Sequence, residues 1–158
     1  MLAETLDDAM TLAAALHNKT LPVLIDKLRG ERRKVCERRD ALAGATARLG
    51  IAELLPELEN LCQLLVDYVA LGHFEVFQVM RECPGGGNAR CRRMHALLDE
   101  LDTGLGDTAQ AAVEFNDRYG GEHTRTFEQL DTDLARLGAV LATRAALEER
   151  LFAAWSAA

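Results

Sequence analysis

Apolar residues recur every three or four positions through most of the chain, which is the periodicity of an amphipathic helix. The densest stretch is Leu61–Met80, which is apolar on almost every side and contains Asp67. A helix that is apolar all round is a buried helix. Because an ionised carboxylate inside a protein is costly unless it is paired, we expect Asp67 either to have a partner within the fold or to face a binding surface.

The same periodicity, with its start and stop signals, divides the whole chain into helices. Thr20 before Pro22 is typical of a helix start, Gly50 is typical of a helix end, and Thr126 opens a capping-box pattern. The stretch Cys83-Pro-Gly-Gly-Gly-Asn88 predicts an exposed loop. We therefore expect helices over residues 3–18, 22–48, 53–82, 89–119 and 126–156.

Long amphipathic helices joined by short glycine-rich turns predict the fold class. The chain has 158 residues, enough for one domain with a core of its own. Its sequence lacks the alternating apolar and polar pattern of strands. We predict an all-α fold for a single domain over residues 1–158, an antiparallel four-helix bundle with an additional short N-terminal helix.

Charge and composition narrow the possible partners. The formal net charge of -7 and the pI near 5.1 argue against a generic nucleic-acid binder and favour a basic protein partner. No apolar run is long enough to span a membrane. The first residues carry Glu4, Asp7 and Asp8, where a secretion signal would carry positive charge. We expect a soluble cytoplasmic protein that does not bind nucleic acid directly and does not bind a membrane.

The cysteines show no paired spacing. Cys36 and Cys62 lie inside predicted helices, and Cys83 and Cys91 flank the predicted loop. In a cytoplasmic protein such residues are usually reduced and act as small apolar fillers. We expect all of them to be free thiols.

Motifs for catalysis or cofactor binding are missing from the sequence. No Glu-x-x-His pair is present for a di-iron centre, and Cys83, Cys91 and His95 lack the close cysteine pairs of structural zinc sites. Gly85-Gly-Gly-Asn88 has neither the preceding strand nor the Lys-Ser/Thr of a phosphate-binding loop. We expect no metal, no cofactor and no enzymatic activity.

A histidine phosphotransfer domain is an alternative, because such domains are four-helix bundles that expose one histidine on a helix. His73 and His95 are the candidates. Neither is followed by the lysine and small residues typical of that family's site, so each is read first as an ordinary helix histidine.

The helix around Asp67 resembles the signature segment of the Rsd/AlgQ family of bacterial regulators. The matching residues run Leu61-Cys-Gln-x-Leu-Val-Asp-Tyr-Val-x-x-Gly-His-Phe-Glu-Val-Phe. A second block, from Leu134 to Leu151, is similar to the family's C-terminal helix. Leu24-Ile-Asp-Lys with the downstream Glu31-Arg32 is similar to its N-terminal pattern.

This resemblance implies an all-helical anti-sigma factor that regulates transcription. Such a protein binds region 4 of the primary sigma factor, sigma-70, sequesters it from core RNA polymerase and so favours alternative sigma factors. Region 4 is a basic helix-turn-helix module, which an acidic partner complements. The resemblance implies neither catalysis nor a cofactor, and other regulatory proteins remain possible partners.

The segments that match the family motifs give a set of candidate partner-binding residues. This set comprises Asp26, Arg32, Asp67, Tyr68, Leu71, His73, Phe74 and Phe77. Separately, Arg144 and Glu148 are four residues apart on an otherwise apolar stripe, which predicts a polar layer inside the bundle. Asp67 has two possible roles: pairing with Arg144 or Arg32 in the interior, or accepting hydrogen bonds from region 4.

The chain also departs from the family pattern. Leu28-Arg29 stands where family members carry Trp-Leu, and Arg38 and Arg39 occupy positions that are aromatic in the family. Aromatic residues often dominate the energetics of an interface. A divergent paralogue that binds another regulatory protein is therefore a further alternative.

Overall fold

The computed structural model describes residues 2–83, 88–121 and 126–156. Its elements are α1 (Leu2–Ala43), α2 (Ile51–Leu71), the π-helical turn η1 (Gly72–Val76), α3 (Phe77–Arg81), α4 (Ala89–Tyr119) and α5 (Leu130–Ser156). The described residues contain no strand. Among these helices, none is long and apolar enough to cross a membrane.

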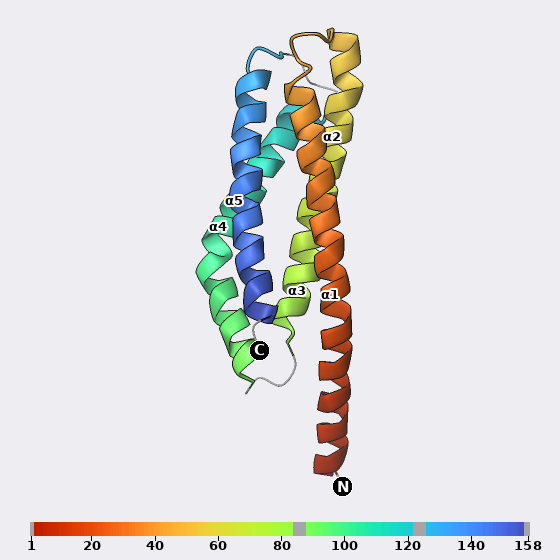
Figure 1. The fold of residues 1–158 in the computed structure, drawn as a ribbon, viewed down its shortest axis with the longest axis vertical. Coiled ribbons are helices and arrows are strands. Elements are labelled where there is room, and N and C mark those ends of the chain that lie inside the picture. The colour runs from red at the N-terminus through yellow and green to blue at the C-terminus, as the bar shows by residue number, and fades with distance from the viewer. Residues whose placement is uncertain (1, 84–87, 122–125, 157–158) are drawn as a thin grey trace.

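The helices run alternately up and down along one long axis (Figure 1). α1 packs against α2 and α5, and α4 packs against the same two helices. η1 and α3 continue α2 without a break, so α2, η1 and α3 together form one rod of the bundle. The N-terminal part of α1 extends past the ends of the other helices (Figure 1). The predicted all-α helical bundle is confirmed.

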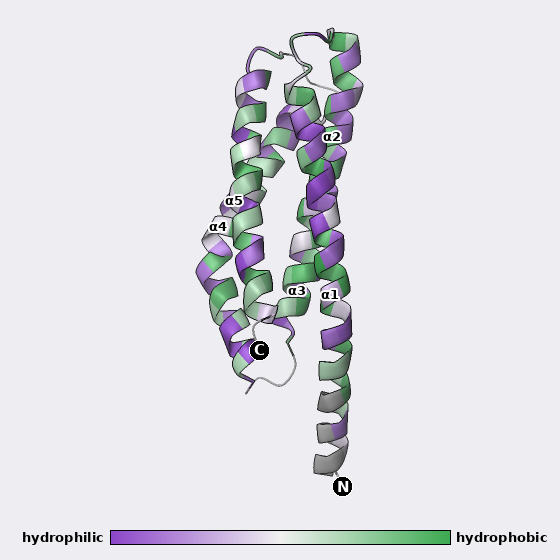
Figure 2. Cartoon of the chain, viewed as in Figure 1, coloured by the Kyte–Doolittle hydropathy of each residue, from purple (hydrophilic) through white to green (hydrophobic). Residues whose placement is uncertain are grey.

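The core follows the predicted apolar stripes. Hydrophobic residues recur along each helix and are interleaved with hydrophilic ones (Figure 2). In α1 the fully buried side chains of Leu21, Leu28 and Val35 are seven residues apart and face the other helices. Matching positions on the other rods complete the core, among them Leu58, Leu61, Leu65, Met94, Leu98, Leu134 and Leu151. Burial of aliphatic side chains is the main favourable term in folding, at about 25 cal/mol per Å² of apolar surface.

The predicted break between helices 3–18 and 22–48 is wrong. α1 continues through Thr20 and Pro22 without interruption. Tertiary contacts on both sides of the proline account for this, because Leu21 is fully buried and the Nε2 atom of His17 lies 2.8 Å from the carbonyl oxygen of Val79. Packing of this kind outweighs the loss of one backbone hydrogen bond at proline. The additional N-terminal helix is thus the first part of α1.

Other helix ends differ from the prediction by a few residues. α1 ends at Ala43 and residues 44–48 form turns, while α2 begins at Ile51 after the N-cap residue Gly50. α4 covers residues 89–119, the range that the sequence predicts. α5 begins at Leu130, so Thr126 does not start it. Instead, the partly buried Phe127 packs against the core, and its carbonyl accepts a bond from the Leu130 N–H at 3.1 Å.

The expectation of free thiols is wrong for two of the cysteines. Cys83 and Cys91 form a disulfide, with their Cα atoms 5.7 Å apart. The end of α3 and the start of α4 bring these residues within disulfide range, a result of chain reversal that residue spacing does not reveal. Cys36 and Cys62 are free, and burial raises the pKa of the Cys62 thiol to about 12.

Candidate protein-binding face and the polar cluster beneath it

A buried ion pair lies at the centre of the bundle. Arg144 and Glu148 on α5 are 1% and 0% exposed, and Nε of Arg144 is 3.4 Å from Oε2 of Glu148. Nη1 of Arg144 donates to Oγ1 of Thr108 at 3.0 Å and to the carbonyl of Leu105 at 3.3 Å, which ties α5 to α4. A charge so far from water needs partners of this kind to remain in the fold.

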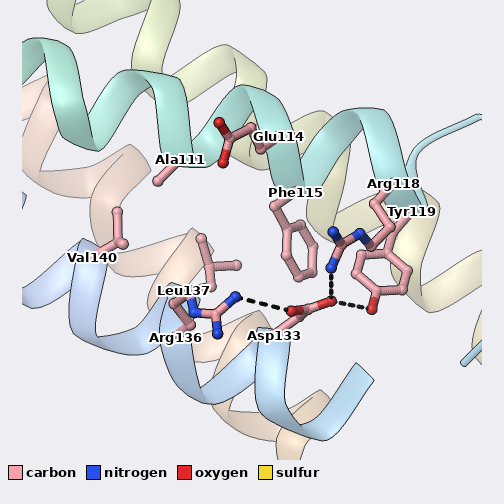
Figure 3. A pocket seen from close by; sticks show the side chains of 9 residues that line it. All are labelled: Ala111, Glu114, Phe115, Arg118, Tyr119, Asp133, Arg136, Leu137 and Val140. Carbon is pink, nitrogen blue, oxygen red and sulfur yellow. Dashed lines mark hydrogen bonds and ion pairs between the residues drawn. The ribbon is translucent and has the colours of Figure 1, made fainter. Parts of the chain in front are cut away.

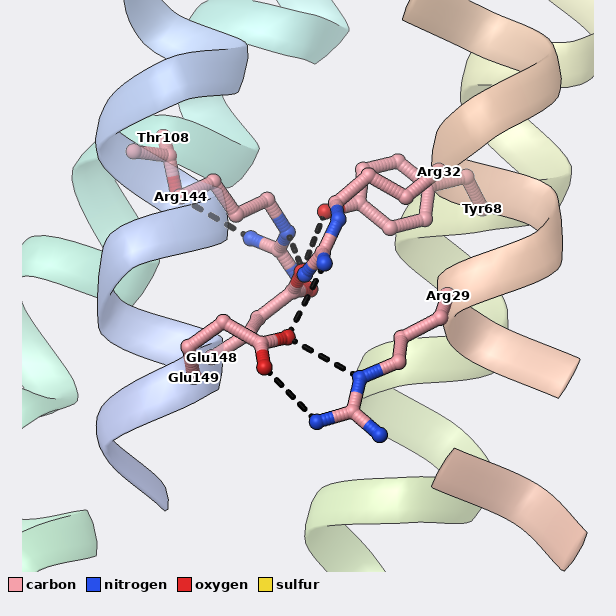
Figure 4. A network of polar contacts seen from close by, with 7 residues as sticks. All are labelled: Arg29, Arg32, Tyr68, Thr108, Arg144, Glu148 and Glu149. Atoms are coloured by element: carbon pink, nitrogen blue, oxygen red, sulfur yellow. Dashed lines mark hydrogen bonds and ion pairs between the residues drawn. The ribbon is translucent and has the colours of Figure 1, made fainter. Parts of the chain in front are cut away.

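The cluster continues from Glu148 to the surface (Figure 4). The Tyr68 hydroxyl donates to Oε1 of Glu148 at 2.6 Å, and Nη1 of Arg32 donates to the same oxygen at 3.0 Å. Arg32 also donates to Glu149 at 2.9 Å, and Arg29 binds the two Glu149 oxygens at 2.7 and 3.1 Å. All the bundle rods therefore contribute to one network.

Burial shifts the pKa values of the two acidic groups in this network, Glu148 and Tyr68. It raises the pKa of Glu148 above its ordinary value, while the Tyr68 hydroxyl and the guanidinium groups of Arg144 and Arg32 limit that rise. Burial and the neighbouring Glu148 carboxylate also raise the pKa of Tyr68. The Tyr68 hydroxyl therefore stays protonated and remains a hydrogen-bond donor.

Gly72 covers the cluster at the start of η1. A Cβ at this position would lie 3.0 Å from Nη2 of Arg144 and 3.4 Å from the ring of Phe77. The Arg144 guanidinium carbon is 5.6 Å from the ring centre of Tyr68 and 5.7 Å from that of Phe77, within cation–π range. A residue without a side chain is what permits this close packing.

Asp67 faces outward, so its interior pairing with Arg144 or Arg32 is wrong. Its side chain is exposed, and Oδ1 accepts a hydrogen bond of 3.0 Å from Nε2 of Gln63 on the same helix. The two arginines bind Glu148 instead. Asp67 lines a shallow hollow between α1 and α2 of about 410 Å³, together with Lys27, Glu31, Ala70, Leu71, Phe74 and Glu75.

An apolar groove, here called the α2–α4 groove, lies next to this hollow. It has a volume of about 400 Å³ and is lined from α2 and η1 by Leu65, Val66, Val69, Ala70, His73 and Phe74, and from α4 by Ala109, Ala112, Val113 and Asn116. Val66, Phe74 and Val113 are 43%, 78% and 47% exposed. Phe74 lines both the groove and the hollow that contains Asp67. Large apolar side chains gathered at one exposed site are typical of interaction surfaces.

The remaining predicted site residues divide between interior and surface. Tyr68, Leu71 and Phe77 are buried, at 0%, 7% and 3% exposed. The side chain of Arg32 is 18% exposed and is held by Glu148 and Glu149. Asp26 is exposed on α1 but is not among the residues that line either hollow. Phe74 therefore lies with Asp67 in the hollow and with His73 in the groove, while Tyr68 and Phe77 lie in the core beneath them.

His73 lies at the edge of the α2–α4 groove. Its ring contacts Phe77 edge-on with centroids 5.6 Å apart, and its Nε2 atom is buried without a hydrogen-bond partner among the described residues. Burial and the charge of Arg144 lower the pKa of His73. A neutral imidazole therefore adds to the apolar character of the groove at neutral pH.

A second polar cluster lies where the C-terminal end of α4 packs against the first turns of α5 (Figure 3). Asp133 accepts hydrogen bonds from Tyr119 and, at 2.7 Å, from Arg118, and Arg136 lies 3.5 Å away. Burial opposes ionisation of Asp133, but these hydrogen bonds outweigh it and hold its pKa below the usual range. The adjacent pocket is only about 70 Å³, so the cluster serves to join two helices.

Comparison with known proteins identifies the family. The family model described as "Regulator of RNA polymerase sigma(70) subunit, Rsd/AlgQ" matches residues 10–155. The chain belongs to the Rsd/AlgQ family. The match includes α2, η1 and α4, whose residues form the α2–α4 groove.

Two individual members of the Rsd/AlgQ family share about 30% sequence identity or less with this chain. "Regulator of sigma D" of Yersinia pseudotuberculosis serotype O:1b (strain IP 31758) is 30% identical over 109 residues, which cover 63% of this chain and 58% of the relative. The protein of the same name from Pectobacterium carotovorum subsp. carotovorum (strain PC1) is 28% identical over 133 residues, 81% of this chain and 84% of the relative. The chain thus spans less than two thirds of the Yersinia relative. No solved structure matches it.

The Rsd/AlgQ motif identified only part of the groove. Val66 and Val113 were not predicted as site residues, although Val66 is a position of the quoted motif; Val113 lies outside it. Their signal is present in the sequence, since each is an aliphatic residue beside the buried stripe of its helix and not on it. Such off-stripe apolar residues on two neighbouring helices can indicate an exposed groove.

Proposed function

We propose that this chain is an anti-sigma factor that binds region 4 of the primary sigma factor, sigma-70, and sequesters it from core RNA polymerase. Alternative sigma factors then gain access to the polymerase. The protein acts in the cytoplasm, where its partner is found, and the role requires neither catalysis nor a cofactor. Membership of a family described as regulators of the sigma-70 subunit supports the partner.

The observation that carries this proposal is the position of Phe74. An aromatic side chain that is 78% exposed lies where an apolar groove meets a hollow containing Asp67. Region 4 is a helical, basic module, so an apolar helix face of region 4 can enter the groove while a basic side chain reaches the carboxylate. Aromatic anchors of this kind dominate the affinity of many interfaces.

The charge of the chain supports the same partner. The net charge is -7, which favours encounter with a basic protein. The basic stretch from Arg29 to Arg39 offers less to an acidic partner than its sequence indicates. Arg29 pairs with Glu149, Arg38 with Glu57 and Arg39 with Asp40, so much of its positive charge is neutralised within the fold.

The phosphotransfer alternative has weaker support. A phosphotransfer histidine must present a ring nitrogen to a partner's phosphoryl group. The Nε2 atoms of His73 and His95 are both buried.

Titration of purified chain with an isolated region 4 fragment tests the proposal. We expect binding at micromolar concentrations or tighter, and we expect the chain to compete with core RNA polymerase for full-length sigma-70. A sigma-70 fragment that lacks region 4 is the control. Absence of binding to region 4 at micromolar concentrations would contradict the proposal.

A further inference from the structure

The Cys83–Cys91 disulfide joins the two rods of the bundle that supply the walls of the α2–α4 groove, at a point outside the groove lining. Cys83 follows α3, which continues directly from η1, the turn that supplies His73 and Phe74. Cys91 is the third residue of α4, the helix that forms the opposite wall. The bond therefore connects the C-terminal end of the α2–η1–α3 rod covalently to the N-terminal end of α4, outside the residues that line the groove.

One polar contact between these rods at this end is a weak surface ion pair. Arg81 lies 3.5 Å from Asp102, but their side chains are 44% and 74% exposed, and such a surface pair contributes little. The hydrogen bond between Nε2 of His17 and the carbonyl oxygen of Val79 connects α3 to α1, not to α4. The disulfide adds a covalent connection between the residues that follow α3 and the first turn of α4.

The two sulfurs are not equally accessible. Cys83 is partly exposed, whereas Cys91 is 2% exposed. An external thiolate therefore attacks the Cys83 sulfur, and Cys91 leaves as a thiolate in the first turn of α4. Asn88 caps this turn by accepting from the Arg90 N–H at 2.8 Å.

A second thiolate completes the exchange. It attacks the external sulfur of the mixed disulfide, releases the Cys83 thiolate and forms the oxidised small thiol. The net reaction converts one protein disulfide and two small-molecule thiols into one protein dithiol and one small-molecule disulfide. Glutathione is a small thiol of this class.

We propose that the Cys83–Cys91 pair is a thiol-controlled switch for the α2–α4 groove. The disulfide keeps η1 and α3 fixed against α4, so the groove is preformed. Reduction frees α3 and the N-terminal end of α4 from each other. The partner must then order these segments as it binds, which lowers its affinity for the chain. The choice of partner rests on the proposed function, but the effect on the groove does not.

The test equilibrates the full chain in mixtures of reduced and oxidised glutathione. Thiol labelling gives the oxidised fraction, and the fluorescence of Trp155, the one tryptophan in the sequence, gives a second readout, because the Arg90 guanidinium lies 5.3 Å from its ring centre. We expect region 4 to bind the reduced chain about tenfold more weakly, equivalent to about 1.4 kcal/mol. Cys83→Ser should match the reduced chain in every mixture, whereas Cys36→Ser should respond like the unmodified chain.

Hydrogen exchange separates this inference from the proposed function. We expect the amides of residues 73–81 to exchange faster after reduction. If region 4 binds neither form, the proposed function fails, and faster exchange in these residues still supports the switch. Unchanged exchange, equal affinity of both forms, or a disulfide that persists in a large excess of reduced glutathione would each overturn it.

Discussion

The Tyr68 hydroxyl donates a 2.6 Å hydrogen bond to Oε1 of Glu148, a residue 80 positions further along the chain. Its neighbour Asp67 points the other way, into solvent. Consecutive residues of the family's signature segment thus have different tasks, one holding the bundle together and the other available to a partner. Substitutions at the surface and in the interior of the bundle should separate these tasks.

Phe74→Ala tests the aromatic anchor. We expect affinity for region 4 to fall at least about tenfold, because truncation of a central aromatic residue commonly costs about 2 kcal/mol. The melting temperature should hardly change, since the ring is 78% exposed. Isothermal titration calorimetry gives the affinity. Ile51→Ala is the matched control, because Ile51 is 62% exposed but does not line the groove.

Asp67→Ala tests the carboxylate beside that anchor. Because Asp67 is exposed and accepts a hydrogen bond only from Gln63 among the contacts described, the fold should be retained, with a stability change within about 0.5 kcal/mol. Binding of region 4 should weaken, and its dependence on salt should decrease. Gln63→Ala controls for loss of the local hydrogen bond. Normal binding by the Asp67 variant would remove this residue from the interface.

Arg144→Ala tests the buried ion pair. We expect a loss of about 3–5 kcal/mol of unfolding free energy, since Glu148 would keep a buried charge with fewer partners. Urea denaturation followed by circular dichroism measures this loss. Arg150→Ala, on the same helix, removes a pair with Glu100 whose side chains are 52% and 63% exposed, and it should cost less than about 1 kcal/mol. Similar losses in both variants would contradict a special role for the buried pair.

Gly72→Ala tests the close packing over the cluster. The new methyl group would lie 3.0 Å from Nη2 of Arg144, so the guanidinium or the Phe77 ring must move. We expect destabilisation of about 1–3 kcal/mol. Gly106→Ala is the control, because a Cβ there meets no atom within 4 Å and should stabilise its helix by about 0.5–1 kcal/mol. Thermal melts of the two variants should therefore shift in opposite directions.

Asp133→Asn tests the pH dependence of the second cluster. The pKa of Asp133 is below its usual value of 3.8 in the fold, so its contribution to stability is present above that value and is lost as the pH falls through the folded pKa. The variant should lose about 1–3 kcal/mol at pH 6 and less in acid. Urea unfolding across this range measures the effect, and the exposed Asp107 provides the control substitution Asp107→Asn.

Periodicity in the sequence was enough to predict most of the core. The seven-residue spacing of Leu21, Leu28 and Val35 marks the buried face of α1, and all three are fully buried. The four-residue spacing of Arg144 and Glu148 on an apolar stripe indicates a polar layer, and these side chains do lie in contact inside the bundle. Both patterns work because helical geometry alone determines which residues share a face.

Features that depend on tertiary contacts could not be predicted in this way. Pro22 is a helix-breaking signal, but contacts of His17 and Leu21 override it. The Cys83–Cys91 bond depends on how α3 and α4 meet, which local spacing does not determine. Asp67 faces outward, and its possible partners Arg32 and Arg144 bind Glu148 instead, a pairing between helices that local spacing does not reveal.

Phe74 lies in the π-helical turn η1, which bears on its exposure. In η1 the Phe77 N–H bonds to the carbonyl of Gly72, five residues earlier, so this turn holds one residue more than an α-helical turn. Phe74 lies inside this widened turn and, at 78%, is the most exposed of the large hydrophobic residues described. The extra residue of the turn therefore coincides with the point where the rod presents an aromatic ring to solvent while Tyr68 before it and Met80 after it stay buried.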